Sequence, residues 1–189
     1  MATLITADNH FDHRQIIKYC TRPFANVTEM NEALVKNWNK VVTPQDTIHV
    51  VGDFAHGGTM EAALSIIKRL NGTKHLIVGN HDDLAVGMND IRPGTWKTIK
   101  DISTVYIMNQ PVILCHYALR TWHHSYRGVI HCYGHSHGTL PSYGKSFDVG
   151  VDCHNYMPWT SKEIIDMANS LPNIHTIPKK DRWDKEDKQ

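Results

Sequence analysis

The stretch TIHVVGDFAH, residues 47–56, joins an apolar run to a glycine, an acid and a histidine. The apolar run, residues 47–51, predicts a buried β-strand. Gly52 lets the backbone turn sharply at its end, and Asp53 and His56 follow at once. Taken alone, this is a turn that contains a polar pair. Its meaning depends on whether other strands of the chain end in the same way.

Four further apolar runs do end in the same way. Residues 3–7, 75–78, 112–115 and 129–133 predict strands, and each is followed directly by polar residues of metal-ligand type. These residues are Asp8, His10, Asn80, His81, Asp82, His116, His135 and His137. Open α/β sheets build their sites at the carboxyl ends of strands. We therefore expect five separate segments to bring these side chains to one place.

The spacing and chemistry of these residues favour a metal site. Residues two apart in an extended segment face the same side, so Asp8 can point with His10, and His135 with His137. The set contains imidazole, carboxylate and one amide, without a thiolate. It suits manganese, iron or zinc and disfavours a cysteine-type structural zinc site.

Bulk composition limits the class of protein. The chain has 189 residues, and Lys plus Arg number 20 against 19 for Asp plus Glu. This balance provides no electrostatic footprint for long duplex DNA or an anionic membrane, although a small nucleotide substrate stays open. Four cysteines without a CxxC pair, no signal-peptide pattern and no apolar run of membrane length predict a cytoplasmic protein. The 14 histidines exceed what a core or a neutral surface requires.

The pattern along the chain predicts one domain over residues 1–178 and a charged tail over 179–189. Helices are expected from Thr28, which is the predicted N-cap, and over 59–70. A capping box at Thr160 to Glu163 opens another. Residues 98–108 predict one strand that turns back into 112–115, and further strands follow at 129–133 and 146–151. We expect βα units first and a mostly antiparallel half second.

In these blocks the chain closely resembles the calcineurin-like metallophosphoesterases. The family pattern is DxH, GDxxD or GDxxH, GNHD or GNHE, a lone His, and GHxH, and all five blocks occur here in order. The resemblance covers roughly residues 5–155. It implies an α/β fold of two facing mixed β-sheets flanked by helices.

The resemblance also implies a dinuclear metal site with manganese as the first choice and iron, zinc, nickel or cobalt as alternatives. One ion would be held by Asp8, His10, Asp53 and His137, and the other by Asp53, Asn80, His116 and His135. Asp53 would bridge the two ions. A bridging water, deprotonated between the two cations, would attack phosphorus in line.

Two histidines have roles that do not require metal ligation. His81 is predicted to protonate the leaving alkoxide, with Asp82 orienting its ring. His56 stands where many relatives carry aspartate; it either fixes a ligand or water, or is a plain turn residue. The role of His154, past the last strand, stays open.

Substrate contacts are predicted mainly in the loop YALRTWHHSYRG, residues 117–128. Arg120 could clamp phosphate oxygens, and we expect at least one of Arg120, His123 and His124 to contact substrate. The alternative is a polar loop whose aromatic residues cover the sheet edge. Arg22 is a weaker candidate of the same kind, and His13 is open between a substrate contact and simple exposure. His131 is interpreted as a sheet residue with its hydrogen bonds satisfied.

The favoured function is metal-dependent hydrolysis of phosphate esters, with a phosphodiesterase preferred over a phosphomonoesterase, whether small-molecule or protein phosphatase. The expected partner is a small phosphate ester, nucleotide-like or otherwise, because relatives of this size lack a capping domain. A rival from another class is a non-catalytic binding module on the same fold. Since every motif block is intact, we rank the module low. Native metal, physiological substrate and oligomeric state are left open.

Overall fold

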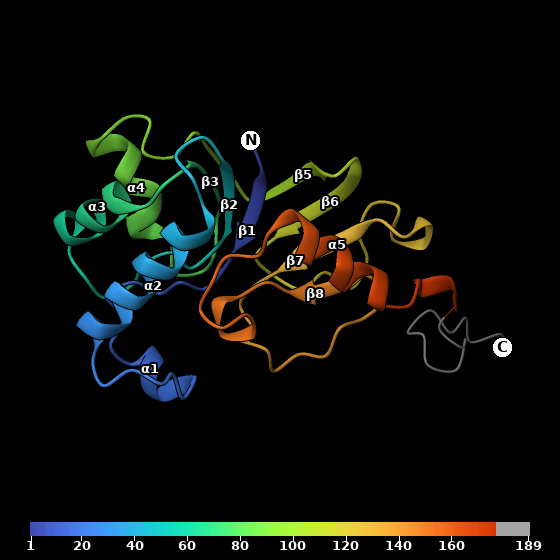
Figure 1. The fold of residues 1–189 in the computed structure, drawn as a ribbon, viewed down its shortest axis with the longest axis horizontal. Coiled ribbons are helices and arrows are strands. Elements are labelled where there is room, and N and C mark those ends of the chain that lie inside the picture. The colour runs from blue at the N-terminus through green and yellow to red at the C-terminus, as the bar shows by residue number, and fades with distance from the viewer. Residues whose placement is uncertain (177–189) are drawn as a thin grey trace, which may run out of the picture.

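Two four-stranded β-sheets form the centre of the computed structural model, which describes residues 1–176 (Figure 1). The first sheet has four parallel strands in chain order, β1 (Thr3–Thr6), β2 (Thr47–Val51), β3 (Thr73–Ile77) and β4 (Thr98–Lys100). The second consists of β5 (Ile102–Ile107), β6 (Gln110–Cys115), β7 (Ile130–Tyr133) and β8 (Ser146–Asp148). The predicted α/β class with two sheets and flanking helices is confirmed. The predicted charged tail, residues 179–189, lies outside the described residues.

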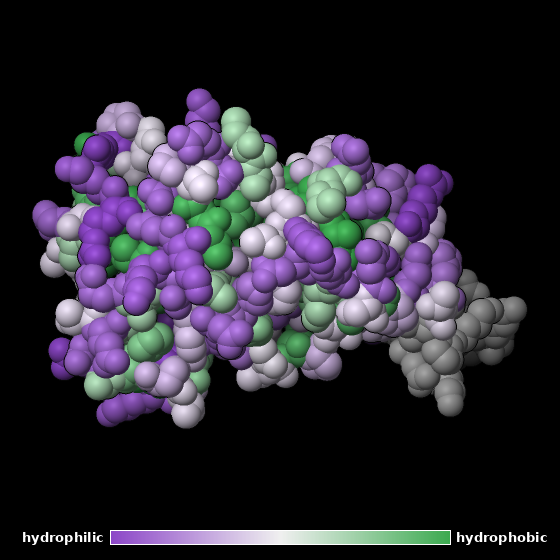
Figure 2. Space-filling view, in the orientation of Figure 1, coloured by the Kyte–Doolittle hydropathy of each residue, from purple (hydrophilic) through white to green (hydrophobic). Residues whose placement is uncertain are grey.

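Apolar residues of both sheets form the core between them. Ile5 and Val51 of the first sheet pack in one buried cluster with Val112, Leu114 and Phe147 of the second. The opposite face of the first sheet is covered by α2 (Val27–Val41), α3 (Met60–Arg69) and α4 (Asp83–Ile91), which Figure 1 shows beside β1 to β3. On the face drawn in Figure 2, hydrophilic side chains cover most of the surface, and apolar ones show only in small areas. No helix within residues 1–176 is long and apolar enough to cross a membrane.

Two sequence-based expectations about the strands are wrong. Residues 98–108 do not form one strand, because β4 ends at Lys100 in the first sheet and β5 begins at Ile102 in the second. The second sheet is not mostly antiparallel either: only β5 and β6 pair antiparallel, whereas β6, β7 and β8 run parallel. Parallel neighbours need crossovers of a dozen or more residues, and the long segments 116–129 and 134–145 provide them.

This strand arrangement positions the polar blocks. Because β1, β2 and β3 are parallel, their carboxyl ends lie at one edge of the first sheet. The same holds for β6 and β7 in the second sheet. The five predicted ligand-bearing segments follow these five strand ends.

Helix ends follow side-chain capping, with one correction. The predicted N-cap Thr28 lies inside α2, whose cap is Asn26, because the Asn26 side chain accepts from the Glu29 N–H at 2.9 Å. The capping box of Thr160 and Glu163 at the start of α5 (Ser161–Ser170) is confirmed. Helix α4, which follows the GNHD block, was not predicted. Short helices complete the fold: α1 (Ile16–Tyr19), η1 (Ser125–Arg127), η2 (Val151–Cys153) and η3 (Ile174–Thr176).

His131 of β7 is a buried residue with both ring nitrogens satisfied, which confirms its interpretation as a satisfied sheet residue. Its Nδ1 donates to the Ile113 carbonyl at 3.1 Å, and its Nε2 accepts from the Leu119 N–H at 3.1 Å. Burial in this setting lowers the pKa of His131 to about 4. The neutral ring therefore anchors the start of the 117–128 loop to the second sheet.

This depressed pKa predicts that His131 makes folding stability dependent on pH. An unfolded histidine has a pKa of about 6.5, so on acidification the unfolded chain takes up the proton first. The contribution is complete above that pH and is lost as the pH falls from about 6.5 towards 4. Urea unfolding at pH 7 and 4.5 should show that wild type loses about 2 kcal/mol more than His131→Gln, which keeps a donor and an acceptor without titrating. Equal losses in the two proteins would contradict this prediction.

Candidate metal centre

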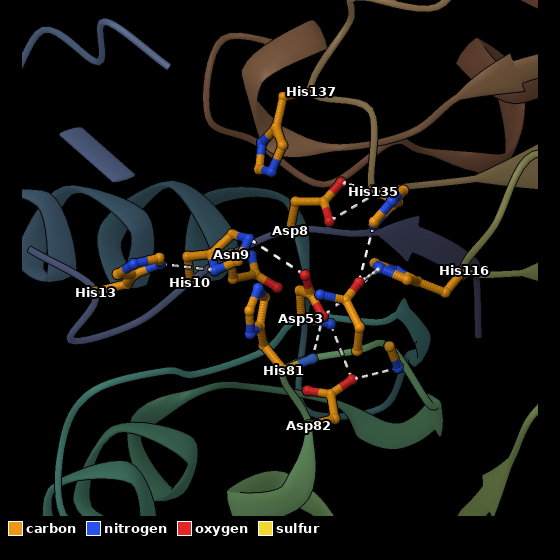
Figure 3. Close-up of polar contacts among 12 residues, drawn as sticks. Asp8, Asn9, His10, His13, Asp53, His81, Asp82, His116, His135 and His137 are labelled. Carbon is orange, nitrogen blue, oxygen red and sulfur yellow. Dashed lines mark hydrogen bonds and ion pairs between the residues drawn. The ribbon is translucent and has the colours of Figure 1, made fainter. Parts of the chain in front are cut away.

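The seven predicted ligands converge from five loops into two neighbouring groups (Figure 3). Ligand atoms of Asp8, His10 and His137 lie within 4.8 Å of one another, and so do those of Asp53, His116 and His135. The Asp53 carboxylate lies between the groups. Its Oδ2 is 3.4 Å from His10 Nε2, and its Oδ1 is 3.6 Å from His116 Nε2. One carboxylate therefore faces both groups, one oxygen to each.

Asn80 lies in the second group, and its amide oxygen faces both histidines of that group. The Oδ1 atom of Asn80 lies 3.1 Å from His116 Nε2 and 2.8 Å from His135 Nδ1. His116 Nδ1 donates to the Val51 carbonyl at 2.9 Å, which leaves a lone pair on Nε2 in the neutral ring. That lone pair faces the amide oxygen of Asn80 and the carboxylate of Asp53. Acceptors that converge in this way are what a divalent cation binds.

The side chains of the first group also fit a positively charged partner. His10 is buried, and its Nε2 has no hydrogen-bond partner among the described residues. Burial lowers the pKa of His10 and keeps its ring neutral, which is the state that metal ligation requires. Burial also raises the pKa of Asp8 well above its usual range. A cation beside these two side chains would satisfy the lone pair and stabilise the carboxylate, so the residues fit a metal ion.

The backbone at the ligands is strained in a consistent way. Five ligands have φ in the left-handed region: Asp8 at 55°, His10 at 51°, Asp53 at 53°, His135 at 67° and His137 at 47°. Such a conformation costs a non-glycine residue roughly 1–3 kcal/mol and clusters at functional sites. Hydrogen bonds beyond the strand ends hold it, since the Asp8 N–H donates to Gly52 O and the His10 N–H to Asp53 O.

Asp152 and Arg22 support the first group from behind. Arg22 is buried and binds Asp152 through both Nε and Nη2, at 2.8 and 2.7 Å. Its Nη2 and Nη1 also donate to the carbonyls of Asp8 and Asn9. His137 Nδ1 lies 2.7 Å from Asp152 Oδ2. Burial lowers the pKa of His137, but this hydrogen bond, the contact with Cys20 and the charge of Asp8 together outweigh burial, and the pKa rises to about 10.

Sequence reasoning missed Asp152 and placed Arg22 differently. Arg22 was expected as a weak substrate contact, but its guanidinium points into the protein and is occupied by protein acceptors. Asp152 directly follows the predicted strand 146–151, so the rule that polar residues after strands form the site could have found it.

Three histidines outside the two groups line a cavity at this site. His13, His56 and His81 line an open cavity of about 1070 Å³ above the ligands. The His56 ring lies 4.6 Å from that of His13 and 4.3 Å from that of His81. His13 Nδ1 is 3.1 Å from the Nδ1 of the ligand His10. His13 thus touches a ligand, and His56 packs between the two other rings.

Asp82 does not orient His81 as the sequence suggested. Its carboxylate accepts the backbone N–H groups of Asp53, Phe54 and Gly79 at 2.8, 2.8 and 2.7 Å. Burial raises its pKa, and these donors act in the opposite direction. Asp82 therefore ties the turns after β2 and β3 together. The His81 backbone N–H in turn donates to Asp53 Oδ1 at 2.9 Å.

The loop 117–128 mostly covers the second sheet. Trp122 is buried there, with Nε1 donating to Val129 O. The ring centroids of His123 and His124 lie 3.8 Å apart, with the rings tilted by 46°. Neither histidine lines the metal cavity, which favours the alternative of a sheet-covering loop for this part. Arg120 lines a separate cavity next to it.

Fold and donor set together define a metallophosphoesterase. A model of the calcineurin-like phosphoesterase family matches residues 1–177, and the chain belongs to that family.

The chain is also similar to individual proteins along most of its length. The chain is 32% identical to the protein MJ1445 of Methanocaldococcus jannaschii over 92% of its own length and 94% of that protein. It is 26% identical to the gene 66 protein of Mycobacterium phage L5, over 92% and 99% of the two chains. The solved structure of AQ665 from Aquifex aeolicus shares the fold, with a TM-score of 0.69, 22% identity and coverage of 88% and 98%.

We predict that Asp152 sets the metal affinity of the first group through His137. Outer partners of metal-bound histidines contribute about 10–100-fold to affinity, so Asp152→Asn should weaken metal binding by that factor. Titration with Mn²⁺ against a competing chelator measures it. Asp166→Asn, an exposed change of the same chemistry on α5, is the control. A folded Asp152→Asn protein with wild-type affinity would show that the contact does not tune the site.

Proposed function

We propose that the protein hydrolyses phosphodiesters with two divalent ions held by the two ligand groups, manganese being the first choice. The observation that carries this proposal is the Asp53 carboxylate, which faces one group with each oxygen. The first ion would be held by Asp8, His10, Asp53 and His137, and the second by Asp53, Asn80, His116 and His135. The unpartnered Nε2 of His10 and the facing acceptors of the second group support this assignment.

The bound ions supply Lewis-acid polarisation of the phosphoryl group and activation of water. The chain contributes two carboxylates, Asp8 and Asp53, against four positive charges of two divalent ions. The local excess of positive charge attracts a phosphate ester to a protein that is near neutral overall. Asn80 ligates without adding negative charge and so preserves this excess.

His81 is proposed to act as a general acid that donates a proton to the leaving group. It lines the cavity, and the hydrogen bond from its backbone N–H to Asp53 Oδ1 fixes it beside the ligand shared by both groups. Its ring lies 5.7 Å from that of His10 and 4.3 Å from that of His56, centroid to centroid. His56, packed between His13 and His81, is proposed to hold this ring at the cavity wall.

The size of the cavity favours diesters over monoesters. At about 1070 Å³, it is larger than one phosphate requires and has room for groups on both ester oxygens. A phosphomonoesterase is the alternative reaction. A non-catalytic binding module is less consistent with seven predicted ligands that converge, five of them with strained backbones.

A panel of substrates tests the proposed reaction directly. Manganese-loaded protein should hydrolyse linear, 2′,3′-cyclic and 3′,5′-cyclic phosphodiesters to different extents, and at least one of them faster than the matching monoester. Hydrolysis of monoesters alone would overturn the diester preference. Absence of hydrolysis of every ester would overturn the proposal that the protein is an enzyme.

We predict that Asp53→Asn removes both ions. Because Asp53 serves both groups, its loss should weaken binding of each ion by more than about 100-fold, beyond the effect of an outer partner. Hydrolysis should fall to background while the circular dichroism of the fold persists. Metal content by mass spectrometry and hydrolysis of bis-nitrophenyl phosphate measure this, with the exposed Asp90→Asn on α4 as control. Near-normal turnover of Asp53→Asn with two bound ions would contradict the shared ligand.

We predict that His81→Gln affects poor leaving groups most. General acid catalysis typically contributes about 10²–10⁴-fold, so the variant should lose that much on nucleotide-type esters, whose alkoxide needs a proton. It should lose much less on bis-nitrophenyl phosphate, because nitrophenolate leaves unaided, and it should keep its metal ions. Equal losses on both substrates with metal intact would instead assign His81 to phosphate binding.

A further inference from the structure

A second cavity lies directly beside the metal cavity. It has a volume of about 360 Å³ and is formed by residues 118–120, which follow the ligand His116, and residues 140–143, which follow the ligand His137. Leu140 lines both cavities. A substrate bound at the metal centre can therefore extend past Leu140 into the second cavity.

The walls of this second cavity are mainly apolar and aromatic. Leu119, Tyr133, Leu140, Pro141 and Tyr143 line it, together with Ala118, Arg120 and Ser146. The Tyr133 hydroxyl is directed to the carbonyl of Leu140 at 3.5 Å. The Tyr143 hydroxyl is buried, so Tyr143 lines the cavity with its ring and not with its hydroxyl. Aromatic rings in the wall can contact a planar ligand.

The cavity is held in place relative to the metal ligands. The Tyr117 ring lies 5.2 Å from that of His116 and 5.0 Å from that of His135. On one side of the cavity, the Leu119 N–H donates to His131 of β7. On the other side, Tyr143 and Ser146 exchange backbone hydrogen bonds at 3.2 Å each. The pocket is therefore preformed, which is the usual condition of small-molecule sites.

We propose that this second cavity binds the nucleobase of a nucleotide-type phosphodiester whose phosphate lies at the metal centre. The proposal rests on the proposed function and specifies its substrate class. A base has π-faces for contact with the tyrosine rings that line the cavity. A sugar would lose its water without enough polar partners, and a saturated chain has no π-face for these rings.

Three diesters with one leaving group test the occupant. The three compounds are phosphodiesters in which one ester group is 4-nitrophenyl and the other is methyl, octyl or thymidine bound through its 5′ oxygen. All three release the same nitrophenolate, so they differ only in the group that stays on the phosphate. The thymidine ester should show a kcat/KM about 10-fold above that of the methyl ester, in line with the usual contribution of stacking. A preference for the octyl ester over the thymidine ester would overturn the nucleobase as occupant.

Two variants place the effect in this cavity. Ala118 is exposed and lines the cavity, so Ala118→Trp should fill it and abolish the preference for thymidine while the methyl ester reacts as before. Ala118→Ser is the matched control and should behave as wild type. Tyr143→Leu removes the ring and should lower kcat/KM about 10-fold on the thymidine ester alone, in line with the loss of one stacking contact. A thymidine preference that survives in Ala118→Trp would place the base elsewhere and overturn the proposal.

Binding of thymidine itself separates this proposal from the proposed function. Saturation-transfer NMR needs no turnover and should show thymidine bound to wild type and to Ala118→Ser, but not to Ala118→Trp. If the protein hydrolyses none of the three diesters but this binding pattern holds, the reaction is wrong and the base site stands. If hydrolysis occurs without a thymidine preference and without this binding pattern, the base site is wrong and the reaction stands.

Discussion

The Asp53 carboxylate is the contact on which the geometry of the site depends, because it faces both groups of metal-type ligands. The surrounding backbone comes unusually close to it. A Cβ on Gly79 would lie 2.4 Å from Asp53 Oδ1, and one on Gly52 would lie 2.1 Å from His116 Nδ1. Only glycine permits this approach. The glycines that begin the GD and GNHD blocks therefore allow the backbone to pack against the predicted ligands as well as to turn sharply.

The site is organised by polar contacts between loops, while the sheets supply their common direction. Asp82 ties the turns after β2 and β3 through three backbone N–H groups. Both oxygens of Asp8 lie 3.0 Å from the His135 N–H, which links the first sheet to the second. The ion pair of Arg22 and Asp152 contacts Asp8 and His137 on the side of the first group that faces the protein interior. Such links can hold five left-handed ligand residues in place, since the strain at each is distributed over several bonds.

The loops that follow the parallel strands make different contributions to the site. The loops after β1, β2 and β3 carry predicted ligands, and α4 begins directly after the GNHD block. The crossovers after β6 and β7 carry predicted ligands at their starts and then line a second cavity beside the first. The same two crossovers thus contribute both to the polar site and to an apolar cavity next to it.

Local sequence was enough to predict most strands, the capping box at Thr160 and the convergence of the ligand blocks, because hydrophobic period, capping and strand-end polarity are properties of neighbouring residues. It did not show that residues 98–108 divide between two sheets, since strand partners are chosen by packing across the core. Likewise, Arg22 and Asp152 are 130 positions apart, and their buried ion pair exists only once the fold brings them together. Tertiary structure alone also placed the loop 117–128, whose composition suits a substrate contact and a sheet cover equally well.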